Sequence, residues 1–360
     1  MRSILKSCMA LLAAGSVIGC GPTVAGPTTP PPQATPAAVT AAPSTLSTPV
    51  PTPQVGGQIV FADGKAASGN WQIYIESADG TNLRQLVRSD ADDFTPSLSP
   101  DGTQVVFHRV DKSGTHDQIL VVNADGTNLH QVKPDGCPGQ CEDAVEGARA
   151  WSADGHILFI RAIFKPDVGP VDVGVWVMNA DGTKARQLTN VGGNCPNACA
   201  GGFQDDEAAW SPDGKHIVFM RDRYTNPELH SLFTMAADGS ELHLLTHLGM
   251  DAGDPDWSPD GSLIVFQSPA EPAEAGMQNL YTIHPDGTGL TQLPEQLSSG
   301  FTYHPCWSPD GSHIVFSHAP GVGSDHPDLF VINADGSGLH VLAATTLDEN
   351  AACWGPSPPG

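Results

Sequence analysis

Short apolar runs recur along the chain, each beside a tight-turn signal, and together they predict a repeated β-sheet unit. The signal is Trp-Ser-Pro-Asp-Gly, followed shortly by two β-branched residues and a phenylalanine. Full copies occupy residues 210–219, 257–266 and 307–316, and looser copies occupy 98–107 and 151–159. Pro-Asp-Gly favours a turn because proline presets the backbone, aspartate bonds back to it and glycine accepts a positive φ. The apolar triplet that follows is typical of a buried strand.

Four apolar runs make up each unit, and the first of them ends at the tryptophan position. Tryptophan positions lie 47 to 59 residues apart, a spacing that fits a propeller blade of four strands. The first runs end at Leu98, Trp151, Trp210, Trp257, Trp307 and Trp354; the second cover 59–61, 105–107, 157–159, 217–219, 264–266 and 314–316; the third cover 73–75, 119–121, 175–177, 232–234, 280–282 and 329–331; the fourth cover 83–86, 129–132, 185–188, 242–245, 290–293 and 339–342.

The order of the runs predicts how the ring closes. The repeat region starts with a second-type run and ends with an isolated first-type run near residues 351–355. Pairing that last run beside Ile59-Val60-Phe61 would complete the first blade and remove an exposed sheet edge. The sequence therefore predicts an all-β, six-bladed β-propeller with four-stranded antiparallel blades, closed by the C-terminal strand.

Two phrases carry a family resemblance. The sequences Pro255–Gly261 (Pro-Asp-Trp-Ser-Pro-Asp-Gly) and Asn179–Thr189 (Asn-Ala-Asp-Gly-Thr before Gln-Leu-Thr) resemble the Pro-Asp variety of WD40-like repeat found in the six-bladed domain of TolB-type periplasmic proteins. The resemblance covers residues 58–355 and implies binding of envelope proteins, as the TolB propeller does. It does not select a function, because similar repeats also accompany peptidases and lyases. TolB proteins carry an α/β domain before the propeller, which is not what precedes it here.

The N-terminal region predicts export and a membrane anchor. Arg2 and Lys6 precede an apolar run, and the segment ends Val-Ile-Gly-Cys at Cys20. This pattern resembles a bacterial lipobox, which implies a lipoprotein signal peptide over residues 1–20 and lipidation of Cys20. An ordinary secretory signal with a chance cysteine is the alternative. Residues 21–55 contain ten prolines and no charged residue, so we expect a disordered linker. The propeller is expected over residues 56–360.

Charge narrows the classes of partner. The chain has 16 basic and 40 acidic residues, which argues against nucleic acid and suits an extracytoplasmic protein of the cell envelope or a cationic partner. Eleven acids belong to the repeated turns and need no further function. They are Asp79, Asp101, Asp125, Asp154, Asp181, Asp213, Asp238, Asp260, Asp286, Asp310 and Asp335.

Strand order predicts two unlike faces. The turns after the first and third strands share one face and are uniform Asp-Gly turns, whereas the loops after the second and fourth strands share the other face and differ between blades. Recognition is expected on this long-loop face. The linker enters on the tight-turn side, so the long-loop face should point away from the membrane.

The cysteines predict local disulfides. Cys137 and Cys141 flank one loop, and Cys195 and Cys199 flank another. In an exported protein such pairs indicate bridges, with a four-thiolate metal site across both loops as the alternative. Cys306 and Cys353 each precede the tryptophan of consecutive repeats. Because equal register points both side chains the same way, we expect two buried thiols there, with a bridge as the alternative.

Oxygen-bearing side chains gather where the first strands begin. Six such strands surround the propeller axis, so these groups are candidates for a site at the channel mouth, which would bind either a cation or a basic partner. Calcium fits these hard oxygens better than zinc. The alternative is that they bond neighbouring backbone N–H groups or are simply solvated. The candidates are Asp93, Glu146, Asp205, Asp206, Glu207, Asp254, His304 and Glu349.

Two functions compete at the end of the sequence analysis. The first is a membrane-anchored lipoprotein, expected to be monomeric, that binds a protein or peptide on its long-loop face. The second is a hydrolase or lyase acting on an oligosaccharide at the channel mouth, using His304 with Asp205, Glu207 or Asp254. The sequence has no G-x-S-x-G elbow, no H-E-x-x-H and no phosphate loop, so no catalytic residue is assigned. No resident cofactor is expected unless calcium binds.

Overall fold

A computed structural model describes most of the repeat region and is the structure discussed below. It describes residues 56–64, 69–112, 117–165, 169–190, 203–223, 226–248, 250–269, 278–293, 300–319, 327–342 and 349–359. The predicted signal peptide, Cys20, the linker, Cys195 and Cys199 lie outside these ranges. Within them, no helix is long and apolar enough to cross a membrane.

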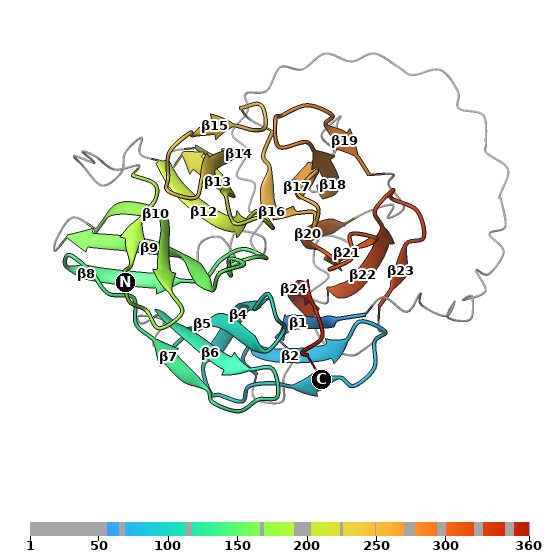
Figure 1. The fold of residues 1–360 in the computed structure, drawn as a ribbon, viewed down its shortest axis with the longest axis horizontal. Helices are drawn as coiled ribbons and strands as arrows, with labels where there is room; N and C mark the ends of the chain where they lie inside the picture. Colours follow the sequence, from blue (N-terminus) through green and yellow to red (C-terminus); the bar gives the residue numbers. More distant parts are fainter. Residues whose placement is uncertain are drawn as a thin grey trace, which may run out of the picture.

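Six four-stranded antiparallel sheets stand around a common axis, as the sequence predicts (Figure 1). Each blade runs from an innermost strand to a short outermost one. The blades are β24 (Glu349–Gly355), β1 (Gln58–Asp63), β2 (Gln72–Ser77) and β3 (Arg84–Gln85); β4 (Asp92–Leu98), β5 (Gln104–Val110), β6 (Asp117–Asn123) and β7 (His130–Val132); β8 (Gln140–Ala144), β9 (His156–Lys165), β10 (Gly169–Asn179) and β11 (Arg186–Gln187); β12 (Phe203–Trp210), β13 (His216–Arg223), β14 (Asn226–Ala236) and β15 (His243–Leu244); β16 (Gly253–Trp257), β17 (Ile264–Pro269), β18 (Gln278–Ile283) and β19 (Thr291–Gln292); β20 (Phe301–Trp307), β21 (His313–Ala319), β22 (Asp328–Asn333) and β23 (His340–Val341).

The C-terminal strand closes the ring at the predicted place. β24 pairs antiparallel with β1, and Trp354 lies opposite Ile59 while Cys353 lies opposite Val60. The first blade is thus built from both ends of the repeat region, with β1 between β24 and β2. Figure 1 shows the red β24 beside the blue β1. The predicted closure is confirmed.

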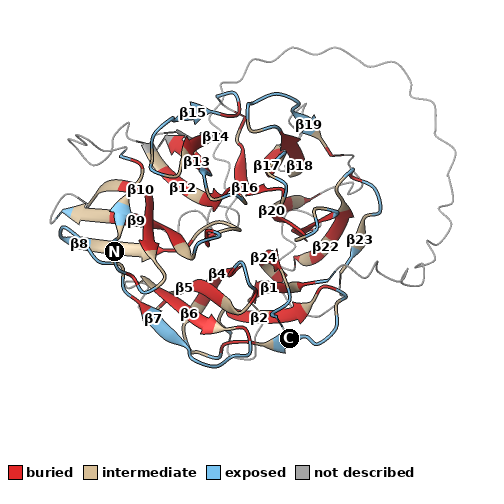
Figure 2. Cartoon of the chain, viewed as in Figure 1, coloured by how far each residue is buried: buried red, intermediate tan, exposed pale blue. Residues whose placement is uncertain are grey.

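The core lies between blades. Each tryptophan of an innermost strand packs against apolar side chains of the preceding blade: Trp210, for example, clusters with Leu158 and Val175, and Trp307 with Val265 and Leu280. Red, buried segments therefore follow the inner strands around the ring in Figure 2, while the outermost strands are largely exposed. Interblade burial of large side chains is what holds the six sheets together.

The Asp-Gly turns are built by their aspartates. In the turn after β16, Asp260 Oδ1 accepts hydrogen bonds from the Ser262 amide at 3.0 Å and from the hydroxyls of Ser258 and Ser262, each at 2.7 Å. These bonds, the Ser258 hydroxyl first, lower the pKa of Asp260 to about 2. Similar bonds recur at the other described turns, which explains why an aspartate occupies this position in each of them.

The third blade departs from the predicted pattern. Its innermost strand β8 stops at Ala144, and Trp151 meets the sheet only through an isolated bridge to Ile157. Between them the chain passes through Gly147, whose φ of 117° leaves the strand conformation. A Cβ at Gly147 would lie 2.4 Å from the Ala208 carbonyl oxygen, so glycine is required where this segment approaches the fourth blade.

Antiparallel pairing within every blade also confirms the two predicted faces. The third and fourth blades carry the longest hairpins of the described region, β9–β10 and β13–β14. Both hairpins turn on the long-loop face, because they join second to third strands. Two neighbouring blades therefore extend this face beyond the ring.

Candidate functional site

Every innermost strand changes conformation at one position near the axis. Five blades place a residue with positive φ three positions before the tryptophan position, and the third blade places Gly147 at nearly the same point. In the five blades the pairing register shifts there, which defines a β-bulge. The residues are Thr95 (φ 45°), Gly147 (117°), Glu207 (50°), Asp254 (50°), His304 (53°) and Ala351 (53°). We call them the bulge ring.

The bulge ring surrounds a hollow at the axis. Most of its members line this hollow together with alanine and proline neighbours. The lining residues are Thr95, Pro96, Gly147, Ala148, Asp254, His304, Pro305, Ala351 and Ala352. Among them, the charged or titratable side chains are Asp254, from the fifth blade, and His304, from the sixth.

Adjacent bulges are bonded to one another. The Asp254 amide donates to Glu207 Oε2 at 2.6 Å, and the His304 amide donates to Asp254 Oδ2 at 3.1 Å. Asp254 Oδ1 also lies 2.8 Å from His304 Nδ1. In each case the carboxylate of one bulge residue accepts a hydrogen bond from the backbone amide of the bulge residue in the next blade. These contacts hold non-glycine residues in a left-handed conformation, which costs of order 1–3 kcal/mol each and is most common at functional sites.

Burial raises the pKa of the carboxyls beside the hollow. Desolvation is the largest cause: it raises the pKa of Glu146 and Glu207 well above the ordinary value and the pKa of Asp206 to about 6. Glu146 and Asp206 share a hydrogen bond, and Asp206 and Asp254 raise the pKa of Glu207 further. A neighbouring cation would favour the charged form of these carboxyls and so oppose this rise.

A charged histidine lies beside the same carboxyls. His230 Nδ1 is 3.1 Å from Asp251 Oδ1, and His230 Nε2 is 3.5 Å from Asp222 Oδ2. Desolvation opposes the charge, but the hydrogen bonds to Asp222 and Asp251 outweigh it and raise the pKa of His230 to about 10. The imidazolium offsets part of the negative charge on the fourth-blade side.

A salt bridge crosses the axis one layer closer to the tight-turn face. Arg149, from the third blade, donates through Nε to Asp256 Oδ1 in the fifth blade at 2.7 Å, and the Trp307 amide donates to Asp256 Oδ2 at 2.8 Å. Asp256 is fully buried. The sequence analysis missed this pair, although Arg149 is the only basic residue in the segments that lead to the six tryptophan positions.

The structure divides the predicted mouth residues into three groups. Glu146, Asp206, Glu207, Asp254 and His304 lie together, as described above. Asp93 and Asp205 instead form two-bonded ion pairs inside their own blades, with Arg109 at 2.6 and 2.9 Å and with Arg221 at 2.5 and 2.7 Å. Glu349 accepts the Leu329 amide at 3.1 Å. Asp93, Asp205 and Glu349 do not line the hollow, because neighbouring strands offer them closer partners.

No ready-made metal cage exists in the described ranges, where no three His, Cys, Asp or Glu side chains are arranged to hold a metal ion. The mouth residues bond to backbone amides and to one another instead. The calcium hypothesis stays a prediction.

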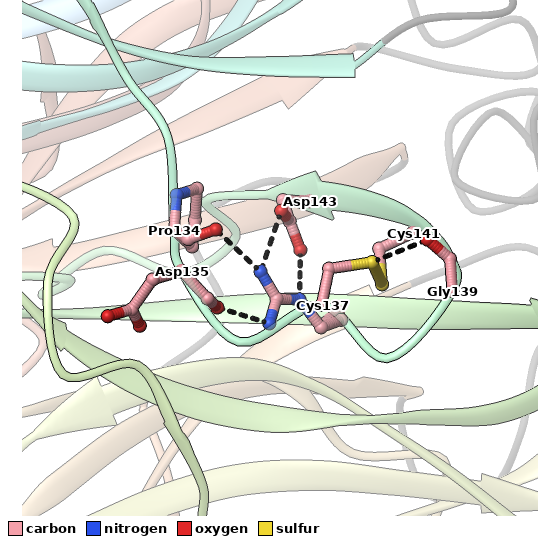
Figure 3. Close-up of a disulfide and its surroundings, with 7 residues drawn as sticks. Pro134, Asp135, Cys137, Gly139, Cys141 and Asp143 are labelled. Atoms are coloured by element: carbon pink, nitrogen blue, oxygen red, sulfur yellow. Dashed lines mark hydrogen bonds and ion pairs between the residues drawn. A yellow bond between two sulfur atoms is a disulfide. The ribbon is translucent and has the colours of Figure 1, made fainter.

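The predicted Cys137–Cys141 disulfide is present (Figure 3). It closes a small loop that ends within β8, next to the buried Arg161. That guanidinium donates to Asp143 and to the carbonyl oxygens of Pro134 and Asp135. The loop is thereby fixed to the third blade on the long-loop face. The second predicted pair, Cys195 and Cys199, and the four-thiolate alternative involve residues outside the described ranges.

Residues 139–358, more than half of the chain, match the family model of the TolB β-propeller domain. A protein described as a TolB homolog from Chlorobium luteolum is 27% identical over 177 residues, which are 49% of this chain and 34% of that protein. The matched region thus spans about a third of this curated relative.

Solved structures share the fold. TolB from Acinetobacter baumannii superposes with a TM-score of 0.62 at 17% identity, covering 84% of this chain and 67% of that one. Hydrazine synthase of Kuenenia stuttgartiensis superposes with a TM-score of 0.58 at 15% identity, covering 84% and 48%. Proteins with such different names share this ring, so the fold alone does not assign a function.

Proposed function

Because the chain belongs to the TolB β-propeller domain family, we propose that it is a cell-envelope protein whose propeller binds a protein or peptide partner through its long-loop face. In this proposal residues 1–20 are a lipoprotein signal peptide, Cys20 carries the lipid anchor, and residues 21–55 link the anchor to a monomeric propeller. The ring binds and orients a partner rather than transforming it.

One observation carries the proposal: the hollow has carboxyls on one side and a backbone fixed by interblade bonds. Asp254 lines the hollow directly, while Glu146, Asp206 and Glu207 lie beside it. Rigid, preorganised acceptors favour a ligand with donor groups, since little conformational freedom is lost on binding. A lysine or arginine side chain, or a free amino terminus, has the matching charge.

Charge distribution supports the same class of partner. All 16 basic residues precede position 224, so residues 224–360 contain no lysine or arginine. These residues form the outer half of the fourth blade, the fifth and sixth blades and the closing strand. An acidic sector without lysine or arginine attracts a cationic partner and accelerates its association.

Two exposed lysines on opposite faces allow a matched test. Lys165 ends β9 on the long-loop face, and Lys184 lies in a tight turn on the other face. A photo-crosslinking amino acid at position 165 should capture a defined envelope protein, whereas the same group at position 184 should not. The captured protein should then bind the purified full chain, with an affinity that falls as salt increases. Equal capture from both positions, or binding indifferent to salt, would contradict the proposal.

The orientation relative to the membrane can be measured with the same positions. The chain enters β1 from the tight-turn side, so the long-loop face is expected to point away from the lipid. Lys165→Cys should react faster than Lys184→Cys with a bulky maleimide on intact vesicles. The reverse order would overturn this orientation.

The contact between His304 and Asp254 favours a second candidate function. These side chains are 2.8 Å apart and both line the hollow, an arrangement able to activate a water molecule as a general base does. If the hollow hydrolyses an oligosaccharide, His304→Gln should abolish turnover while the folded protein keeps its melting temperature. Failure of a panel of envelope oligosaccharides to be cleaved would leave partner binding as the function.

A further inference from the structure

Two cysteines meet where the ring is closed. Cys306 in β20 and Cys353 in β24 are both buried, and their sulfur atoms lie 2.8 Å apart. This separation is shorter than the 3.5–4.0 Å at which unbonded carbon atoms settle. Both thiols are buried and unbonded here, as the sequence analysis expected, but equal register does not keep them apart. Instead, innermost strands of adjacent blades converge on the axis, so side chains that point the same way come into contact.

The surroundings fix both sulfur atoms. The Trp354 amide donates to Cys306 Sγ at 3.1 Å, and Cys353 Sγ lies 2.8 Å from the Ala148 carbonyl oxygen. The guanidinium of Arg149 is close enough to interact electrostatically with both cysteines, and its Nη2 has no hydrogen-bond partner. Burial nevertheless raises the pKa of the Cys306 thiol well above its ordinary value, and Arg149 offsets only part of that rise, so Cys306 is held as a thiol while the ring is closed.

We propose that Cys306 and Cys353 form a disulfide that joins the sixth blade to the closing strand. This seam disulfide would convert a ring closed by β-pairing into one closed covalently. The Cys137–Cys141 bridge of the same chain points to an oxidising environment, where such a pair is stable.

The oxidant is a small or protein-borne disulfide. The thiolate of one cysteine attacks a sulfur of that disulfide, forms a mixed disulfide and releases one thiolate. The second cysteine, once deprotonated, attacks its neighbour in the mixed disulfide and releases the other thiolate. Two protons and two electrons leave the protein, and the oxidant is reduced to two thiols.

Burial sets the order of events. Cys306 has no exposed surface and Cys353 is 4% exposed, so an oxidant cannot reach either sulfur in the closed ring. The attack on the oxidant must occur before β24 docks or while β24 is transiently released. The bridge itself can then close only when β24 has docked beside the sixth blade.

Peptide mapping of the exported full chain tests the proposal directly. The protein is unfolded in a denaturant that contains N-ethylmaleimide and no reductant, so that every free thiol is alkylated. Trypsin leaves both cysteines in one peptide because residues 224–360 lack lysine and arginine, whereas cleavage at aspartate separates them at Asp310 and Asp335. A linked pair of unalkylated peptides is expected. Alkylation of both Cys306 and Cys353 would overturn the proposal.

A stability measurement tests the consequence. Joining residues 47 apart in sequence should raise the melting temperature by about 5–10 °C relative to the Cys306→Ala/Cys353→Ala variant. Reduction in denaturant followed by refolding should lower the melting temperature of the wild type and of Cys137→Ser/Cys141→Ser by more than that of the alanine variant, in which only local bridges such as Cys137–Cys141 are reduced. If the alanine variant does not fold, the response of the other two decides. No response to reduction would contradict a bridge at the seam.

Discussion

At the scale of single residues, Glu76 is a charged residue at a position where the repeat otherwise places a buried apolar side chain. The equivalent residues in the other blades are buried and apolar, namely Val122, Met178, Met235, Ile283 and Ile332. Glu76 is 2% exposed and neither carboxyl oxygen has a hydrogen-bond partner. Desolvation, with a smaller effect of Glu349, raises its pKa to about 8.

Glu76→Met should stabilise the protein, and more so at high pH. The pKa of Glu76 rises on folding, from 4.5 to about 8. Below the pKa of the unfolded state the carboxyl is protonated in both states and its contribution to stability is fully present. That contribution is lost as the pH rises through the pKa of the folded state, because the buried carboxyl must then ionise. Relief of a buried unpaired group is worth about 1–3 kcal/mol. The gain in melting temperature at about pH 8 should therefore exceed the gain at about pH 4.5.

Glu241→Gln is the matched control, because Glu241 is exposed. Its melting temperature should follow that of the wild type at both pH values. A pH-independent gain for Glu76→Met would show that packing alone, and not the buried charge, limits stability at this position.

At the scale of elements, one turn position recurs in a left-handed conformation. The third residue after each turn aspartate of the third-to-fourth strand connection has a φ of 56° to 69°: Asn82, Asn128, Lys184, Glu241, Gly289 and Gly338. Glycine and asparagine tolerate this region, whereas other residues cost roughly 1–2 kcal/mol.

Glu241→Gly should therefore stabilise the fourth blade by about 1 kcal/mol, which thermal or urea denaturation can resolve. Asn82→Gly is the control and should give little or no gain. The side-chain amide of Asn82 donates hydrogen bonds to the hydroxyls of Ser77 and Thr81, and substitution by glycine removes both bonds. Equal gains from both changes would refute the role of side-chain type at this position.

Three consecutive blades contain the same Asp–Arg pair between first and second strands. The pairs are Asp93–Arg109, Asp143–Arg161 and Asp205–Arg221, each with the guanidinium over a phenylalanine of its own blade. Arg161 differs because it is fully buried and also bonds two backbone carbonyls, whereas the Arg109 and Arg221 side chains are 18% and 15% exposed.

Arg161→Ala should destabilise the protein by about 3–5 kcal/mol, since it leaves the Asp143 carboxylate and two carbonyls without their donor. Arg109→Ala should cost less, because water can reach Asp93 once the side chain is removed. Urea denaturation of both variants measures the difference. Equal losses would contradict the importance of the buried carbonyl contacts.

The strands could be predicted from sequence because the same local signals repeat six times. Tryptophan, the Asp-Gly turn and the apolar triplet each specify a local conformation, and repetition removes the ambiguity of any single copy. The bulge ring could not be predicted, since Thr95, Glu207, Asp254, His304 and Ala351 share no chemistry; what they share is backbone geometry set by the neighbouring blade.

The candidate site was predicted in part for the same reason. Glu146, Glu207, Asp254 and His304 were found because their position in the strand places them near the axis. The partners of Asp93 and Asp205 were missed because cross-strand register within a blade, and not position along the strand alone, decides where a carboxylate points. Arg149 crosses between blades that are distant in sequence, which no local pattern encodes.

At the scale of the whole molecule, stability depends on closing the ring. β24 supplies the innermost strand of the first blade, and Trp354 packs with Val315 and Val331 of the sixth blade. Removing residues 349–360 should expose the edge of β1 and both neighbouring cores, and abolish the cooperative unfolding transition.

Removing residues 356–360 alone is the control, because it leaves β24 intact. This shorter protein should unfold cooperatively near the wild-type midpoint. Circular dichroism and limited proteolysis distinguish the two proteins. A cooperative transition after the longer deletion would mean that five complete blades and an incomplete first blade are sufficient.

The placement of β1 between β24 and β2 also has a mechanical consequence. A pull on the chain ahead of Gln58 loads a strand that is hydrogen-bonded along both sides, so the two ladders share the tension in shear. An edge strand in that position would resist the same pull through a single ladder. A protein held by its N-terminal side can therefore sustain drag on its partner-facing side without its first blade being peeled away.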